Sequence, residues 1–112
     1  MGGEFVTDFL AVVPMVLEAR GLDVTPGMRD RVNSQGDSRG ALILQRILDD
    51  EIRHVALGAK HFVALCGRVG IQPENHWKTL VGRHFRGTLK PPFNDSARLA
   101  AGLSREFYAS VA

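Results

Sequence analysis

Glu51 and His54 are the residues whose types and spacing most strongly suggest chemistry. A spacing of three residues in a helix places a carboxylate and an imidazole on one face, one turn apart. Helical spacing puts Glu51 near the centre of an apolar stripe and His54 at its edge. The stripe consists of Leu44, Ile47, Leu48, Val55, Gly58, Phe62, Leu65 and Cys66. A carboxylate in such a stripe must be paired, neutralised or bound to a metal, because an uncompensated buried charge is costly.

Glu18 is a second candidate for a buried carboxylate. Its helical face carries small or apolar residues, namely Thr7, Ala11, Pro14 and Met15. If the helix that contains Glu18 lies antiparallel to the long helix, Glu18 could face Glu51 and His54. A Glu-x-x-His sequence that points inward from a helix is typical of di-metal carboxylate bundles. The alternative is an internal Glu51–His54 ion pair, with Glu18 bonded to a backbone group or an arginine. His61, two turns beyond His54, could be an extra ligand, although a packed or interface histidine is the simpler interpretation.

The elements that must position these residues are all expected to be helices. Apolar periodicity and capping signals predict helices over about 4–20, 26–33, 38–68, 73–85 and 95–111. Gly21 is expected to end the first helix, and Thr25-Pro26 to begin the second. Pro14 is expected to kink the first helix, which is apolar on nearly all sides and therefore needs neighbours on more than one side.

Length and composition limit the possible classes of protein. The 112 residues predict a single helical domain, with 45% apolar residues and a net charge of +2. We expect no membrane segment, since no apolar run reaches the roughly 20 residues needed. We also expect no nucleic-acid partner, because the arginines considered for that role are scattered: Arg29, Arg31, Arg83 and Arg86. The single cysteine, Cys66, and the absence of a basic leader favour a cytoplasmic protein, and residues 1–5 could be vector-derived.

Three segments together resemble an uncharacterised ferritin-like family of unknown function. They are EARGLDVTP at 18–26, DEI-x-HVA-x-G at 50–58 and KPPFN at 90–94. The resemblance covers nearly the whole chain and implies a ferritin-like four-helix bundle with two carboxylate-bridged metal ions. In that pattern each half of the bundle offers one Glu on one helix and Glu-x-x-His on the next. Glu18, Glu51 and His54 match one half, and no other Glu-x-x-His is found in the sequence.

The chain therefore resembles the C-terminal half of a ferritin-like bundle. We expect two copies to form a homodimer whose four-helix core contains four glutamates and two histidines. The resemblance implies iron, or else manganese or zinc, with iron-dependent oxygen chemistry or metal storage; it names no substrate. Glu18 and Glu51 would be ligands or bridges, and His54 a terminal ligand. The main alternative is a metal-free helical interaction module with the same dimer core and no catalytic activity.

Overall fold

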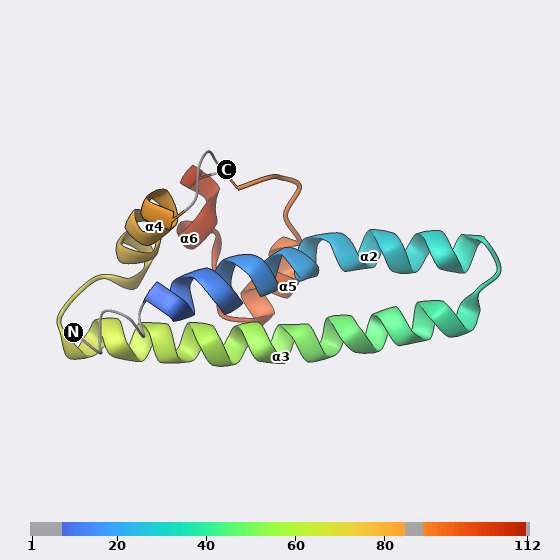
Figure 1. Cartoon of the computed structure of the whole chain (residues 1–112), viewed down its shortest axis with the longest axis horizontal. Coiled ribbons are helices and arrows are strands. Elements are labelled where there is room, and N and C mark those ends of the chain that lie inside the picture. Colours follow the sequence, from blue (N-terminus) through green and yellow to red (C-terminus); the bar gives the residue numbers. More distant parts are fainter. Residues whose placement is uncertain (1–7, 85–88, 112) are drawn as a thin grey trace.

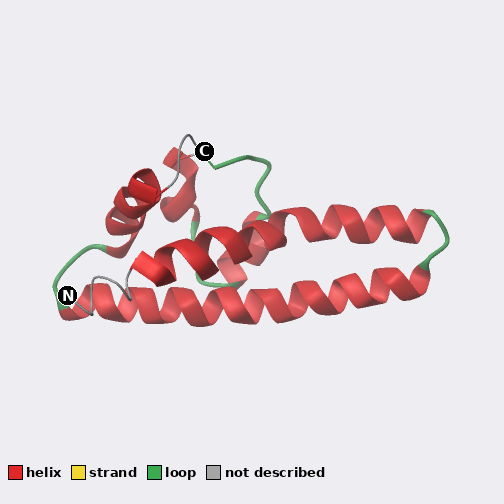
Figure 2. Cartoon of the chain, in the orientation of Figure 1, coloured by secondary structure: helices red, strands yellow, loops and turns green. Residues whose placement is uncertain are grey.

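The computed structural model describes residues 8–84 and 89–111, and this part of the chain is helical without strands. The helix that starts in the described part at residue 8 passes through a π-helical segment, η1 (Val13–Glu18), into α2 (Ala19–Ser34). A tight turn then leads to α3 (Ser38–Arg68), which runs back along α2 to form a long antiparallel hairpin (Figures 1 and 2). The helices α4 (Pro73–His84), α5 (Asp95–Ala100), α6 (Arg105–Tyr108) and the 3-10 turn η2 (Ala109–Val111) complete the fold.

The predicted break near Gly21 is wrong, because the helix continues through Gly21 and Pro26 to Ser34. Proline inside a helix removes the hydrogen bond to the carbonyl four residues earlier. Here that carbonyl belongs to Leu22, and it accepts a hydrogen bond of 3.0 Å from Asn94 Nδ2 instead. A side chain from a distant part of the sequence therefore replaces the bond that Pro26 cannot make.

The prediction for the long helix is confirmed. Asp37 caps its first turn by accepting a hydrogen bond from the Gly40 amide at 2.8 Å. At its other end Gly70 has a φ of 72°, a left-handed conformation that glycine adopts without steric cost. Five positions of the predicted stripe are buried: Leu48, Val55, Gly58, Phe62 and Cys66. Leu44 and Leu65 are only partly buried, and Ile47 is 47% exposed.

The last predicted helix is divided into shorter pieces. Asn94 caps α5, since its side chain accepts a hydrogen bond from the Ala97 amide. The chain then turns at Gly102, where φ is 84°, before α6 begins at Arg105. This turn brings Phe107 and Tyr108 back into the core, where Phe107 packs edge-on against Trp77 of α4 with 5.8 Å between ring centroids.

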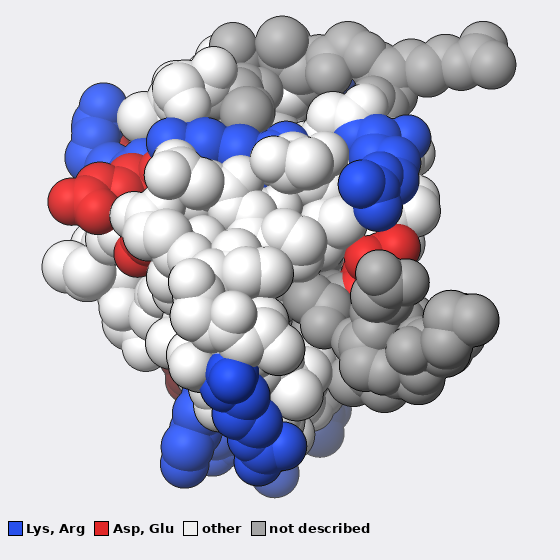
Figure 3. All heavy atoms as spheres, turned by 90° about the vertical axis from the view of Figure 1, so that its left-hand side faces the viewer, with Lys and Arg blue, Asp and Glu red and all other residues white. Residues whose placement is uncertain are grey.

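The helix α5 contacts both long helices of the hairpin, α2 and α3. Among the described residues, helical spacing groups several exposed apolar side chains on each of the two long helices: Leu17, Val24 and Met28 on one, and Ile43 and Ile47 on the other. We call these five residues the open face. A second, mainly uncharged surface lies at the end where α3 leads into α4, with exposed Val63, Val69 and Ile71 (Figure 3).

No helix in the two described ranges is long and apolar enough to cross a membrane. The predictions for residues 1–5, Thr7 and Arg86 lie outside the described residues.

Candidate metal centre

The structure brings the three predicted ligand residues together. One ligand atom each from Glu18, Glu51 and His54 can be chosen so that all three lie within 4.8 Å of one another. Glu18 comes from the end of η1, and the other two come from one turn of α3. The antiparallel hairpin thus creates the cluster from residues that are 33 positions apart in the sequence.

The Glu51 carboxylate is partly buried and incompletely paired. Its side chain is 25% exposed, and His54 Nδ1 lies 3.8 Å from Oε1, too far for a hydrogen bond. Oε1 is buried and has no hydrogen-bond partner among the described residues. At this distance the predicted internal ion pair between Glu51 and His54 is only a loose contact. The His54 side chain is also 64% exposed.

Burial and a neighbouring carboxylate both act on the pKa of Glu51. Burial raises the pKa of Glu51 above its ordinary value of 4.5, and the nearby charge of Glu18 raises it further. His54 lowers the same pKa, but by less. Two neighbouring carboxylates with one histidine form a site in which a cation would relieve both the desolvation and the repulsion.

The π-helical segment η1 sets the position of Glu18. The backbone amide of Ala19 bonds to the carbonyl of Pro14, five residues earlier, where an α-helix would bond four residues earlier. Such single-turn π segments occur frequently at functional sites. Just before this segment, the carbonyl of Ala11 accepts a buried hydrogen bond of 3.2 Å from Trp77 Nε1.

Gly58 of α3 allows the close approach of η1. A Cβ atom at Gly58 would lie 2.4 Å from Cγ of the Pro14 ring, so no larger residue fits without a shift. Gly21 plays a smaller role, since a Cβ there would lie 3.5 Å from Cγ of Glu51, an ordinary contact. The cluster is therefore held by helix packing and by few polar bonds.

His61, His76 and Cys66 lie outside the cluster. His61 is exposed and does not join the group that contains His54. His76 stacks on Phe62 with 5.9 Å between ring centroids, as expected for a histidine at the edge of the core. Cys66 is buried, and burial raises its thiol pKa, which confirms the interpretation of a small core residue.

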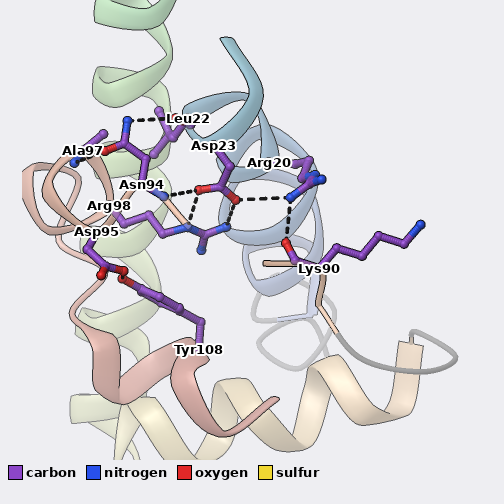
Figure 4. Close-up of polar contacts among 9 residues, drawn as sticks. All are labelled: Arg20, Leu22, Asp23, Lys90, Asn94, Asp95, Ala97, Arg98 and Tyr108. Carbon is purple, nitrogen blue, oxygen red and sulfur yellow. Dashed lines mark hydrogen bonds and ion pairs between the residues drawn. The ribbon is translucent and has the colours of Figure 1, made fainter. Parts of the chain in front are cut away.

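A second polar cluster was missed by sequence reasoning. Asp23 of α2 accepts hydrogen bonds from Arg98 Nε at 2.9 Å and Nη2 at 2.6 Å, and from the Asn94 amide at 2.9 Å (Figure 4). The Asp23 and Arg98 side chains are 1% and 3% exposed. Arg20 adds a contact of 3.7 Å to Asp23 and donates to the Lys90 carbonyl at 2.7 Å. We call this group the Asp23–Arg98 network.

Aromatic rings enclose the arginine of this network. The guanidinium carbon of Arg98 lies 4.8 Å from the ring centroid of Phe93 and 4.6 Å from that of Tyr108. The Tyr108 hydroxyl donates to Asp95 at 2.5 Å. Burial, followed by the hydrogen bond to Asp95 and by its charge, raises the pKa of Tyr108 to about 12. The sequence did contain one signal for this network. Asp23 and Asn94 lie in two of the three segments that resemble the family, and these two segments are in contact in the structure.

Comparison with known proteins identifies relatives without an assigned activity. A chain from Haemophilus influenzae, named "Uncharacterized protein", is 35% identical over 96 residues, which are 86% of this chain and 33% of that protein. The present chain thus spans about a third of the length of that relative. No solved structure matches. A family model described as "Protein of unknown function (DUF455)" matches residues 4–109, and the chain therefore belongs to this family.

Proposed function

We propose that this chain is a ferritin-like metal-binding half-bundle whose ligands are Glu18, Glu51 and His54. The observation that carries the proposal is the convergence of these ligand atoms within 4.8 Å, with Glu51 Oε1 buried and unpartnered among the described residues. A structural carboxylate would be expected to have its hydrogen-bond partners in place. A carboxylate that lacks them, beside a second carboxylate, fits a cation.

The donor set suits iron, manganese or zinc. Carboxylates favour hard divalent ions, while imidazole suits iron and zinc. In this proposal Glu18 and Glu51 bind or bridge metal ions, and His54 is a terminal ligand that must be neutral to bind. Bound iron or manganese supplies redox chemistry, and bound zinc supplies Lewis acidity.

A second copy of the chain would complete the site. A di-metal carboxylate site of the ferritin-like class uses four glutamates and two histidines, and one chain offers two glutamates and one histidine. The open face lies beside the cluster and exposes apolar surface, including Leu17 at 56% and Ile43 at 57%. An isologous interface across this face would supply the second set of ligands. In longer family members, further chain could cover the same face.

The deciding experiment combines elemental analysis, solution mass and melting temperature. We expect bound metal in the purified protein, a dimer by light scattering at low micromolar concentration, and a melting temperature that rises when iron is added. Glu51→Ala should abolish that rise. The matched control is Asp49→Ala, which removes an exposed carboxylate from the same helix and should leave the rise unchanged.

A metal-free interaction module is the second candidate, and the exposed apolar residues of the open face favour it. It predicts a dimer that contains no metal. Under this alternative, Glu51→Ala shifts the melting temperature equally in chelator and in excess iron. A protein that is both monomeric and metal-free would contradict both candidates.

A further inference from the structure

A cavity of about 250 Å³ lies between α2 and the segment that leads into α5. Its described walls do not include Glu18, Glu51 or His54, so it is separate from the candidate metal centre. Five of its lining residues are apolar: Met15, Val16, Leu17, Leu89 and Phe93. The other four are charged: Arg20, Asp23, Lys90 and Arg98. The cavity therefore combines apolar walls with a charged end that belongs to the Asp23–Arg98 network.

The charges around the cavity favour an anion. Two of the lining residues, Arg20 and Arg98, bring guanidinium groups to the network beside the cavity, and Asp23 brings a carboxylate. The Lys90 side chain points away from this network (Figure 4), so the net charge beside the cavity is +1. The Asp23 carboxylate is already occupied by Arg98 and the Asn94 amide, with Arg20 3.7 Å away. Asp23 can therefore neutralise only part of the positive charge on the cavity wall.

Arg98 also carries a hydrogen-bond donor without a partner. Its Nε and Nη2 bind Asp23, while Nη1 is buried and unpartnered among the described residues. Figure 4 shows that this third nitrogen points away from Asp23. A buried unpaired donor costs roughly 1–3 kcal/mol, and more when it is charged. Arg98 lines the cavity, so an acceptor bound there would relieve this cost after a small shift of the guanidinium, whose Nη1 is itself buried.

We infer that the cavity binds a short aliphatic carboxylate. Guanidinium groups match the planar geometry of a carboxylate, so its oxygen atoms would be held by Arg98 and Arg20. Its alkyl chain would lie against the apolar wall made by residues such as Val16 and Leu89. The volume holds roughly eight groups of the size of water, at about 30 Å³ each. Hexanoate, with six carbon and two oxygen atoms, is a ligand of this size.

The test uses three small probes on the whole 112-residue chain. Binding of hexanoate, hexan-1-ol and acetate is followed by amide chemical shifts in NMR spectra. We expect saturable binding of hexanoate in the millimolar range or tighter, at least tenfold tighter than either of the other two. Shifts should be concentrated around Val16, Leu89 and Phe93. Equal binding of hexan-1-ol would overturn the inference, and so would a linear response to hexanoate without saturation.

Two variants locate the binding without removing the buried arginine. Val16→Trp fills the cavity from a half-buried position and should weaken hexanoate binding at least tenfold. Arg20→Gln removes one cation from a side chain that is 44% exposed and should weaken binding about threefold. Arg46→Gln, an exposed position on α3, is the matched control and should change nothing. Unchanged affinity in Val16→Trp, with its melting temperature preserved, would place the ligand elsewhere and contradict the inference. The metal proposal is not involved, because none of these variants alters its ligands.

Discussion

Asp23 and Glu51 are two carboxylates on neighbouring helices with opposite surroundings. Asp23 is almost fully buried and accepts from an arginine fork and a backbone amide. Glu51 is less buried, yet one of its oxygens has no partner among the described residues, and the ionisable groups that act on its pKa are Glu18 and His54. The more deeply buried carboxylate, Asp23, therefore has its hydrogen-bond partners in place. The less buried carboxylate, Glu51, lacks a partner for one of its oxygens.

This difference separates a structural group from a candidate binding group. A buried ion pair with its hydrogen bonds satisfied holds elements in one arrangement, and here it joins α2 to α5. An unsatisfied carboxylate beside another carboxylate lowers stability in the absence of a ligand, and so points to a site that a ligand completes. The following predictions test this division, from the largest expected effect to the smallest.

Asp23→Ala should give the largest loss of stability. It leaves Arg98 buried without its partner, and breaking a buried pair in this way costs about 3–5 kcal/mol. Urea denaturation measures the change in the free energy of unfolding. Asp50→Ala is the control, because it breaks the exposed Asp50–Arg53 pair on α3 and should cost at most about 1 kcal/mol. Equal losses in the two variants would remove the basis for treating Asp23 as structural.

Gly58→Ala should cost about 1–3 kcal/mol, because its new methyl group would overlap the Pro14 ring. The same change at Gly67, also in α3, meets no atom within 4 Å and should stabilise by about 1 kcal/mol through helix propensity. Thermal melts of the two variants provide the comparison. If Gly58→Ala proved stabilising as well, the close packing of η1 on α3 would not be what positions Glu18.

Glu51→Gln should raise the stability of the metal-free protein at neutral pH by about 1 kcal/mol, since it removes an incompletely satisfied charge. The pKa of Glu51 is raised in the folded state, so the folded protein holds this proton more tightly than the unfolded chain does. The resulting stabilisation is complete below pH 4.5 and is lost as pH rises through the folded-state pKa.

Denaturation in chelator between pH 4 and 7 measures this effect. The difference in stability between Glu51→Gln and the unmodified protein should grow as pH rises, whereas Glu106→Gln, at an exposed position, should show no such trend. A difference that shrinks with rising pH would mean that the Glu51 carboxylate is already well compensated.

The smallest expected effect concerns the pKa of Tyr108. Its titration can be followed directly, because it is the only tyrosine of the chain. Its phenolate absorbance should appear with a midpoint near 12, the pKa that burial and Asp95 produce. Asp95→Asn should lower the midpoint, because it removes a neighbouring negative charge, but burial should keep it above the ordinary value of 10. A midpoint near 10 in the unmodified protein would indicate that this part of the fold is open to water.

The long helix and the three cluster residues could be predicted because their signals are local. Apolar periodicity, the Asp37 cap and the terminal Gly70 lie within one element, and Glu51 and His54 share one turn of it. Glu18 required one further assumption, that the two long helices are antiparallel, and the structure confirms that arrangement.

The continuity of α2 could not be predicted, because the reason lies far away in the sequence. Gly21 and Pro26 are local signals for a break, yet Asn94 supplies the hydrogen bond that Pro26 lacks. For the same reason the role of Arg98 was not visible: its partner Asp23 is 75 residues away. Tertiary contacts outweighed local propensity at these positions.

The π-helical turn η1 has a consequence for comparing sequences within the family. It contains one more residue than an α-helical turn would need, and its five-residue hydrogen-bonded turn covers about the same rotation as the four-residue turn of an α-helix. A relative that lacks one residue within Val13–Glu18 could therefore close the same helix as a regular α-helix. Glu18 would keep its direction toward α3, and the Ala11 carbonyl would keep its direction toward Trp77. A one-residue gap at this place in an alignment would therefore mark a regular turn in place of η1, with both flanking contacts kept.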